Sequence, residues 1–343
     1  MSEPILEVEG VRKHFPIRKG LLLREVGQVK AVDGVSFAVQ PGETLGLVGE
    51  SGCGKSTLGR TLVRLYEPTA GSIRYRGEDF LAVKGERLRH MRRTLQMIFQ
   101  DPFASLDPRM TIARILAEPF KVHDVCPPKE RQERAAALLE TVGLKTAHLN
   151  RYPHEFSGGQ RQRISIARAM ALNPDLVIAD EPVSALDVSI QAQILNLMRE
   201  LQDEFKLTYI FISHDLSVID HFCDRIAVMY LGKIIEMAPR DELFNHPQHP
   251  YTRALIDAIP KVGQGKRRMK QVLGGEVPSP IDPPAGCHFH PRCPQRFDGC
   301  DRGFPALREE RRDHFVACKL YSDAVEDSDK IILRSTDLRN TGT

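Results

Sequence analysis

The sequence predicts an α/β fold whose core is a parallel β-sheet, and three apolar runs carry this prediction. Residues 44–48, 175–180 and 207–213 have the length and composition of buried strands. The stretch between the last two runs places apolar side chains at helical spacing. A strand, helix, strand order is the crossover that parallel strands need. With 343 residues and 41% hydrophobic side chains, the chain can fill such a core and carry an extension.

The first hundred residues add strands of a second, antiparallel part. Residues 5–15 and 29–39 alternate loosely between apolar and polar side chains, as strands of a half-exposed sheet do. The segment between them, residues 16–24, carries a triple leucine flanked by cations. It is expected to form a loop folded back on its own domain, and contact with a membrane surface or a partner is the alternative. Further strands are expected at 71–77 and, buried, at 95–99.

Helices are expected in two places after these strands. From 101 to about 170, helix-forming segments are broken by prolines, and we interpret this region as a helical subdomain of one domain spanning residues 1–260. The crossover helix follows it, and its expected buried stripe is Ile190, Ile194, Leu197 and Leu201.

Seven prolines interrupt the chain after residue 260. Residues 261–320 are therefore expected to form an extension without long helices or central strands. Residues 321–343 are polar and mixed in charge, so they are expected to be a disordered tail.

The run 44–48 leads into the pattern G-x-x-x-x-G-K-[ST], the phosphate-binding P-loop. Its glycines let backbone N–H groups turn toward the β- and γ-phosphates of a nucleotide, at the positive end of the next helix. Lys55 adds a charge there, and the Ser56 hydroxyl is placed to bind Mg²⁺. A glycine-rich turn before an ordinary helix is the alternative reading, but the strand, loop, helix order favours the nucleotide. The expected binding residues are Gly49, Glu50, Ser51, Gly52, Cys53, Gly54, Lys55, Ser56 and Thr57.

Composition excludes several classes of protein. Lys and Arg number 48 against 45 Asp and Glu, and a formal charge of +3 gives no support to a dedicated nucleic-acid binder. The apolar runs fall short of the roughly 20 residues that span a bilayer. The N-terminus lacks the regions of a signal peptide, so the chain is expected to stay in the cytoplasm, where its seven cysteines would be thiols or metal ligands.

An acidic pair, Asp180 and Glu181, closes the apolar run 175–180. In P-loop proteins an acid at such a strand end holds Mg²⁺. Acidic pairs at strand ends are more often solvated turn residues, so this pair decides little alone. The deciding feature is Phe156-Ser157-Gly158-Gly159-Gln160, about a hundred residues after the P-loop. Here the sequence resembles the ATP-binding-cassette family, whose signature reads leucine-Ser-Gly-Gly-Gln.

The remaining motifs of that family follow in order. Gln100 matches the Q-loop, which links the metal site to a membrane partner, and Ser184 to Asp187 match the D-loop at the dimer seam. His214 matches the switch histidine that contacts the γ-phosphate, although a lone histidine is more often structural. Phe15 stands where the family stacks an aromatic ring on adenine, but it could equally be an ordinary strand residue.

The resemblance narrows toward the C-terminus and covers the chain up to about Lys319. Residues 239–244 and 249–255 look like the ATPases of bacterial dipeptide and oligopeptide importers. Residues 143–146, 151–154 and 180–188 are similar to the F-type subunit of dipeptide permeases. This resemblance implies ATP-driven uptake of dipeptides or short oligopeptides, by a protein at the cytoplasmic face of the cell membrane.

The resemblance also implies a mechanism. Each ATP would lie between the P-loop of one subunit and the signature of another, because one chain carries one copy of each. Glu181 would activate the attacking water, while Asp180, Ser56 and Gln100 would surround Mg²⁺. Lys55 and His214 would contact the γ-phosphate, and Gln100 would report nucleotide state to the permease. The signature residues expected at the nucleotide are Ser157, Gly158, Gly159 and Gln160, with Asp187 of the D-loop.

The implied partners are a related D-type ATPase subunit, two membrane-spanning permeases and an external peptide-binding protein, with no nucleic acid. A P-loop kinase or GTPase is one competing function, but it would lack the signature and the switch histidine, and this sequence has both. The other competing function is a soluble ATP-binding-cassette ATPase acting on ribosomes or nucleic acid. Such a protein would carry a long coiled coil between P-loop and signature, or two cassettes in one chain, and this sequence has neither.

Four of the seven cysteines crowd into the extension. They are Cys287, Cys293, Cys300 and Cys318. A segment with many prolines and little core of its own is a candidate for a metal staple. Four thiolates suit a [4Fe–4S] cluster, which some ATPases of the resembled group carry. Zinc and unliganded thiols stay open, because the spacing C-x₅-C-x₆-C-x₁₇-C lacks the paired C-x₂-C of common zinc sites.

Overall fold

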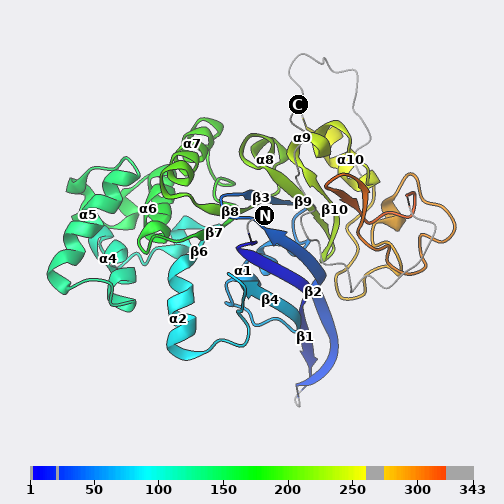
Figure 1. Ribbon diagram of the computed structural model, residues 1–343, viewed down its shortest axis with the longest axis horizontal. Helices are drawn as coiled ribbons and strands as arrows, with labels where there is room; N and C mark the ends of the chain where they lie inside the picture. The colour runs from blue at the N-terminus through cyan, green and yellow to red at the C-terminus, as the bar shows by residue number, and fades with distance from the viewer. Residues whose placement is uncertain (1–2, 21–22, 260–273, 322–343) are drawn as a thin grey trace. The chain divides into compact units, whose positions relative to one another are not determined.

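A computed structural model describes residues 3–20, 23–259 and 274–321 of the chain (Figure 1). These residues form two compact units. Within the described ranges, the first unit comprises residues 3–20, 23–40, 45–81, 214–259 and 274–321, and the second comprises Pro41–Thr44 and Ala82–Ser213. Apart from Tyr321, the tail expected at 321–343 lies outside the described residues.

The first unit contains an antiparallel sheet of order β2-β1-β4-β5. Its strands are β1 (Leu6–Lys19), β2 (Arg24–Val39), β4 (Ala70–Tyr75) and β5 (Glu78–Asp79). The predicted loop at 16–24 is wrong, because β1 and β2 continue as one hairpin to the pair Lys19 and Arg24 (Figure 1). Pro16 is tolerated there because β4 pairs with β1 only as far as Arg12, which leaves one edge of β1 without a partner strand in that sheet.

The other sheet of this unit contains the strand that precedes the P-loop. β3 (Thr44–Val48) runs parallel to β9 (Arg225–Tyr230), and the order continues through β10 (Lys233–Pro239) and β12 (His314–Val316) to β11 (Arg308–Arg311). All five residues of β3 are buried, as the apolar run predicts. The helices of the unit are α1 (Lys55–Leu62), α8 (Leu216–Phe222), α9 (Arg240–Asn245), α10 (Pro250–Asp257) and the short η4 (His290–Arg292).

The second unit combines three parallel strands with most of the helices. β6 (Leu95–Ile98), β7 (Leu176–Asp180) and β8 (Thr208–Ser213) pair in that order. α7 (Val188–Phe205) is the predicted crossover between β7 and β8. The other helices are α2 (Gly85–Thr94), α3 (Pro102–Ser105), α4 (Ile112–Val122), η1 (Pro128–Glu130), α5 (Arg131–Thr141), η2 (Thr146–Asn150), η3 (Pro153–Glu155) and α6 (Gly158–Met170).

The predicted stripe on α7 is confirmed for three of its four members. Ile194, Leu197 and Leu201 are buried, whereas Ile190 near the helix start is half-buried. Among the described residues, no helix has both the length and the apolar character needed to cross a membrane.

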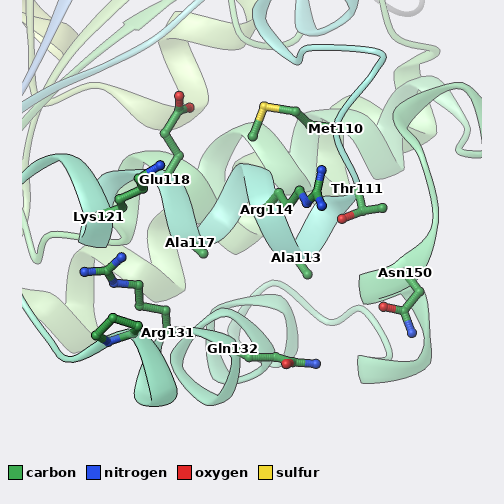
Figure 2. A pocket seen from close by; sticks show the side chains of 11 residues that line it. Met110, Thr111, Ala113, Arg114, Ala117, Glu118, Lys121, Arg131, Gln132 and Asn150 are labelled. Carbon is green, nitrogen blue, oxygen red and sulfur yellow. The ribbon is translucent and has the colours of Figure 1, made fainter.

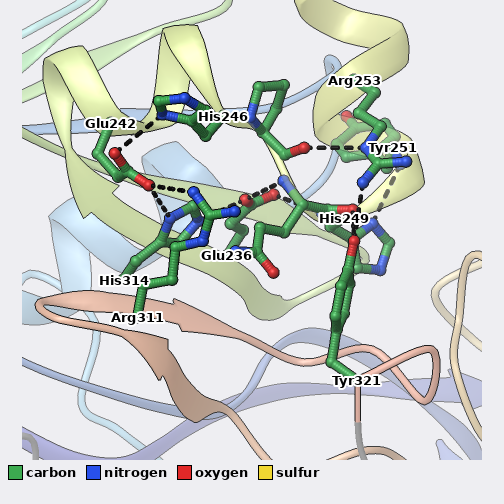
Figure 3. Close-up of polar contacts among 11 residues, drawn as sticks. Glu236, Glu242, His246, His249, Tyr251, Arg253, Arg311, His314 and Tyr321 are labelled. Atoms are coloured by element: carbon green, nitrogen blue, oxygen red, sulfur yellow. Dashed lines mark hydrogen bonds and ion pairs between the residues drawn. The ribbon is translucent and has the colours of Figure 1, made fainter.

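A buried polar cluster joins the extension to the sheet of the first unit that contains β10 (Figure 3). Glu236 on β10 and His314 on β12 are both fully buried, and 2.7 Å separates a Glu236 carboxylate oxygen from Nε2 of His314. The same carboxylate accepts the backbone N–H groups of Gln248 at 2.7 Å and His249 at 2.9 Å. Because β12 pairs with β10, this cluster fixes the strand that ends the extension.

A second carboxylate extends the cluster toward the surface. Glu242 on α9 lies 3.4 Å from Nδ1 of His314 and 3.2 Å from the Arg311 guanidinium. His246 contacts its other oxygen at 3.0 Å (Figure 3). His314 therefore sits between two carboxylates, one fully buried and one half-exposed.

Candidate nucleotide site

The P-loop has a backbone that only glycine can adopt at its key positions. Gly49, Gly52 and Gly54 have φ values of 154°, 78° and 106°, where L side chains are rarely found. A Cβ on Gly49 would lie 2.2 Å from the carbonyl oxygen of Met229, and one on Gly54 would lie 2.0 Å from a carbonyl oxygen. The turn can thus close tightly before α1 begins at Lys55.

Lys55 is buried inside this loop with 3% of its surface exposed. Its Nζ donates to the carbonyl oxygens of Gly49 at 2.7 Å and Glu50 at 3.0 Å. These bonds hold the ammonium where it can bind phosphate as a point charge. Cys53 is also buried, and burial raises the pKa of its thiol, so it packs the loop as a neutral group.

Glu50 receives support that the sequence did not predict. Its backbone N–H donates to the hydroxyl of Tyr251 on α10 at 2.9 Å. Its carboxylate accepts two hydrogen bonds from Arg292 of the extension, at 2.8 and 3.1 Å. Arg292 stands in His290-Pro291-Arg292-Cys293, where no motif or periodicity signals a contact with the P-loop.

The acidic pair lies in the second unit, at the end of β7. Asp180 is the last strand residue and is fully buried. Glu181 follows with a φ of 46°, in the left-handed region, where a residue with a side chain costs roughly 1–2 kcal/mol. Its N–H donates to the carbonyl of Ile212 on β8 at 3.0 Å, which holds this conformation.

The structure brings together Glu181 and Gln100, two residues that the sequence analysis named separately. Gln100 follows β6 and is exposed. Its Nε2 donates to a Glu181 carboxylate oxygen at 2.9 Å. This bond fixes the Glu181 carboxylate beside the Gln100 amide, so the pair suits a general base and a group that orients it.

The signature begins a helix. Ser157 caps α6 through a reciprocal pair with Gln160, at 3.4 Å for the Gln160 N–H and 3.1 Å for the Ser157 N–H. Ser157 is exposed, while Phe156 is buried against His148 at a ring distance of 5.5 Å. Phe156 thus fills an apolar site, which explains why it can stand for leucine.

The two signature glycines pack closely against the D-loop region within the same unit. A Cβ on Gly159 would lie 2.6 Å from Ile190, and one on Gly158 would lie 3.4 Å from Leu186. Gln191 holds this region by donating to the carbonyl oxygens of Val183 at 3.1 Å and Leu186 at 3.0 Å. Asp187 is exposed at the start of α7.

The two remaining predicted nucleotide residues belong to the first unit. His214 follows β8 directly and is exposed. Phe15 is half-buried on β1, edge-on to the Tyr66 ring at 5.4 Å, with Nζ of Lys13 4.9 Å from its centre. The ring is therefore held by neighbours of its own sheet region, and its role toward adenine stays a prediction.

The extension cysteines share one neighbourhood. The Cys287 N–H donates to the Cys300 carbonyl at 2.8 Å. Burial raises the pKa of the Cys287 thiol to about 12 and that of Cys318 to about 11, with the neighbouring cysteines adding smaller contributions. Across the described ranges, however, no three His, Cys, Asp or Glu side chains are placed to hold a metal ion. The structure gives no support to the expected cluster or zinc.

A hollow of about 630 Å³ lies among α4, α5 and η2 of the second unit (Figure 2). None of its lining residues belongs to the predicted site. The lining residues are Met110, Thr111, Ala113, Arg114, Ala117, Glu118, Lys121, Pro128, Arg131, Gln132 and Asn150.

Two family models match the chain. The ABC transporter model matches residues 32–184, and the model of the oligopeptide/dipeptide transporter C-terminal region matches residues 235–300. The chain is 58% identical over 325 residues to the oligopeptide transport ATP-binding protein AppF of Bacillus subtilis. The aligned region covers 94% of this chain and 98% of AppF. It belongs to the ATP-binding-cassette ATPases of the oligopeptide/dipeptide transporter type.

Other relatives agree with this membership. The dipeptide transport ATP-binding protein DppF of Haemophilus influenzae is 50% identical over 317 residues, 92% of this chain and 97% of that one. Among solved structures, the dimeric post-hydrolysis state of the ATP-binding cassette MJ0796 bound to ADP and Pi is similar, with a TM-score of 0.61 and 28% identity. That match covers 68% of this chain and 98% of the other. The ABC fold and an ATPase activity are thereby confirmed for this chain, and the soluble alternative gains no support.

Proposed function

We propose that this ABC ATPase drives the uptake of dipeptides or short oligopeptides. The observation that carries the proposal is the match to the oligopeptide/dipeptide transporter C-terminal region at residues 235–300, on a chain with a complete set of ABC motifs. AppF and DppF, which align over more than nine-tenths of the chain, are named for oligopeptide and dipeptide transport. The peptides carried would be selected by the permeases and the binding protein.

Within this function, each site residue takes one role. Lys55 and the P-loop amides bind the phosphates, and His214 and Ser157 contact the γ-phosphate. Glu181 accepts a proton as the water oxygen bonds to the γ-phosphorus and the bond to the ADP oxygen breaks. Mg²⁺, when bound with ATP, neutralises the charge that develops on the phosphates.

Three further residues suit metal binding and signalling. The Asp180 carboxylate and the Ser56 hydroxyl are hard oxygen ligands of the kind Mg²⁺ prefers. Gln100 already donates to Glu181, so a change in nucleotide state at the base would reach the Q-loop through one hydrogen bond. Gly49, Glu50, Ser51, Gly52, Cys53, Gly54, Thr57, Gly158, Gly159, Gln160 and Asp187 complete the proposed nucleotide contacts, with Phe15 at adenine.

In this proposal the chain is peripheral to the cytoplasmic face of the membrane, where it belongs to a larger assembly. This assembly comprises this chain, a D-type ATPase partner, two permeases and an extracytoplasmic peptide-binding protein. A second ATPase is needed because the chain carries one P-loop and one signature. The similar cassette MJ0796 is a dimer in its ADP- and Pi-bound structure.

The isolated chain is accordingly expected to hydrolyse ATP poorly, while the complex isolated from detergent-solubilised membranes is active. Both are assayed at several protein concentrations, with Lys55→Ala as the inactive reference. Co-isolation of hydrophobic permeases and peptide-stimulated turnover support the importer. Recovery with ribosomes or DNA, or full activity of a demonstrated monomer at every concentration, would contradict it.

A metal staple in the extension remains part of the proposal, with a [4Fe–4S] cluster first and zinc second. Anaerobically purified protein is expected to be brown and to lose this colour when Cys287, Cys293, Cys300 or Cys318 is replaced by Ser. Cys126→Ser, in the second unit, is the matched control and should keep the colour. Colourless protein with one equivalent of zinc would reject the cluster and retain the staple, and metal-free protein would reject both.

A further inference from the structure

The extension reaches the P-loop through one nearly buried arginine. Arg292 of η4 has 5% of its side chain exposed, and its NH1 and NH2 donate to separate oxygens of the Glu50 carboxylate at 2.8 and 3.1 Å. The guanidinium also donates to the Tyr230 hydroxyl at 3.3 Å and, through Nε, to the Gly274 carbonyl at 3.2 Å. This planar two-point contact fixes orientation as well as charge.

The backbone N–H, the backbone carbonyl and the side-chain carboxylate of Glu50 each form a hydrogen bond. Its N–H donates to Tyr251, its carbonyl oxygen accepts from the Nζ of Lys55, and its carboxylate accepts from Arg292. The contact with Lys55 is direct, so any movement of Glu50 moves the carbonyl that orients the phosphate-binding ammonium. Contacts from the P-loop and from the extension therefore together determine where Glu50 lies.

Three packed aromatic rings lie beside Arg292 and restrict its movement. Phe289 of the extension is fully buried, with ring distances of 5.4 Å to Tyr230 and 5.3 Å to Tyr251. Tyr230 and Tyr251 themselves lie 4.7 Å apart. The hydroxyl groups of these two tyrosines contact Arg292 and the Glu50 N–H, so one packed cluster supports both ends of the ion pair.

The negative charge of Glu50 lies in the loop that is proposed to bind the phosphates of ATP, so its neutralisation by Arg292 bears on ATP binding. The Glu50 side chain is 24% exposed, and it stands second in a loop that wraps a polyanion. Without a counter-charge its carboxylate would repel the phosphates. Arg292 cancels that charge at hydrogen-bonding distance.

We propose that Arg292 is a positioning residue for ATP binding, through which the C-terminal extension sets the affinity of the P-loop. It acts by neutralising Glu50 and by fixing the carbonyl that orients Lys55. This inference rests on the proposed role of the P-loop in binding ATP.

The test measures ATP affinity, KM and kcat in the assembled transporter. Arg292→Gln is expected to raise the dissociation constant and the KM for ATP about tenfold, within the usual range of coupling between sites, with a smaller change in kcat. Adding Glu50→Gln to Arg292→Gln is expected to recover most of that loss, because the uncompensated carboxylate is gone. A merely structural role would lower thermal stability and leave the double variant no better than the single one.

Controls separate this inference from the proposed function. Arg311→Gln also removes an extension arginine that pairs with a carboxylate, but it leaves Glu50 untouched and should bind ATP normally. Lys55→Ala should abolish ATP binding; if it does not, the P-loop role itself fails. If Lys55→Ala abolishes binding while Arg292→Gln binds as wild type, only the inference is rejected. Should Arg292→Gln misfold, Arg292→Lys tests the positioning role: the charge stays but the fork is lost, so a smaller loss of ATP affinity is expected, and unchanged affinity would reject Arg292 as a positioning residue.

Discussion

Replacing Glu181 by Gln is expected to lower ATP hydrolysis by roughly 10²- to 10⁴-fold, the usual contribution of a positioned general base, while ATP still binds. Gln has the shape of Glu and can still accept the hydrogen bond from Gln100, so the pair that holds position 181 survives. What disappears is the oxygen that takes the proton from water. Single-turnover hydrolysis and equilibrium ATP binding, measured on the assembled transporter, separate the two effects.

The control for Glu181→Gln is a second carboxylate of the same unit, and the assay is arranged so that only one ATP site can turn over. Glu204→Gln changes an exposed carboxylate on α7 and should leave turnover unchanged. Because an asymmetric pair could keep the activity of its other site, the partner ATPase carries an inactivated P-loop in every sample. Turnover near that of the wild type in Glu181→Gln would remove Glu181 from the role of base.

Local signals predicted most of the nucleotide motifs and the strands beside them. The runs 44–48, 175–180 and 207–213 are strands to within one residue, because a fully apolar run bounded by turns has few other stable states. Glu181 could be named as a candidate from its place after the apolar run together with the family resemblance. Its left-handed backbone could not, because that conformation is imposed by a bond to a different strand.

The errors and omissions come from contacts that are distant in sequence. The segment 16–24 is predicted to be a loop because it lies between two alternating runs, but the pairing of β1 with β2 extends through it to Lys19 and Arg24. The pair of Glu50 with Arg292 spans 242 positions, and Glu236 with His314 spans 78. Nothing in the composition around any of these four residues indicates its partner.

The largest stability effect is expected at His314. In His314→Ala, the fully buried Glu236 carboxylate loses the imidazole of His314. Of its described partners it keeps the backbone N–H groups of Gln248 and His249. Breaking a buried pair by removing one member costs about 3–5 kcal/mol, because the remaining charge is uncompensated in the interior. β12 should detach from β10 first, because Glu236 and His314 link these two strands and only a short stretch of β12 pairs with β10. Chemical unfolding of the full chain and limited proteolysis of the extension measure the two effects.

A second variant and a control show whether charge is the cause. His246→Ala removes an imidazole that pairs with Glu242 from the exposed side, and it should leave the unfolding midpoint almost unchanged. Adding Glu236→Gln to His314→Ala should restore part of the lost stability, because a neutral amide oxygen still accepts a backbone N–H but needs no counter-charge. If the double variant is less stable than His314→Ala alone, the loss arises from packing around the ring of His314, and the buried carboxylate is not its source.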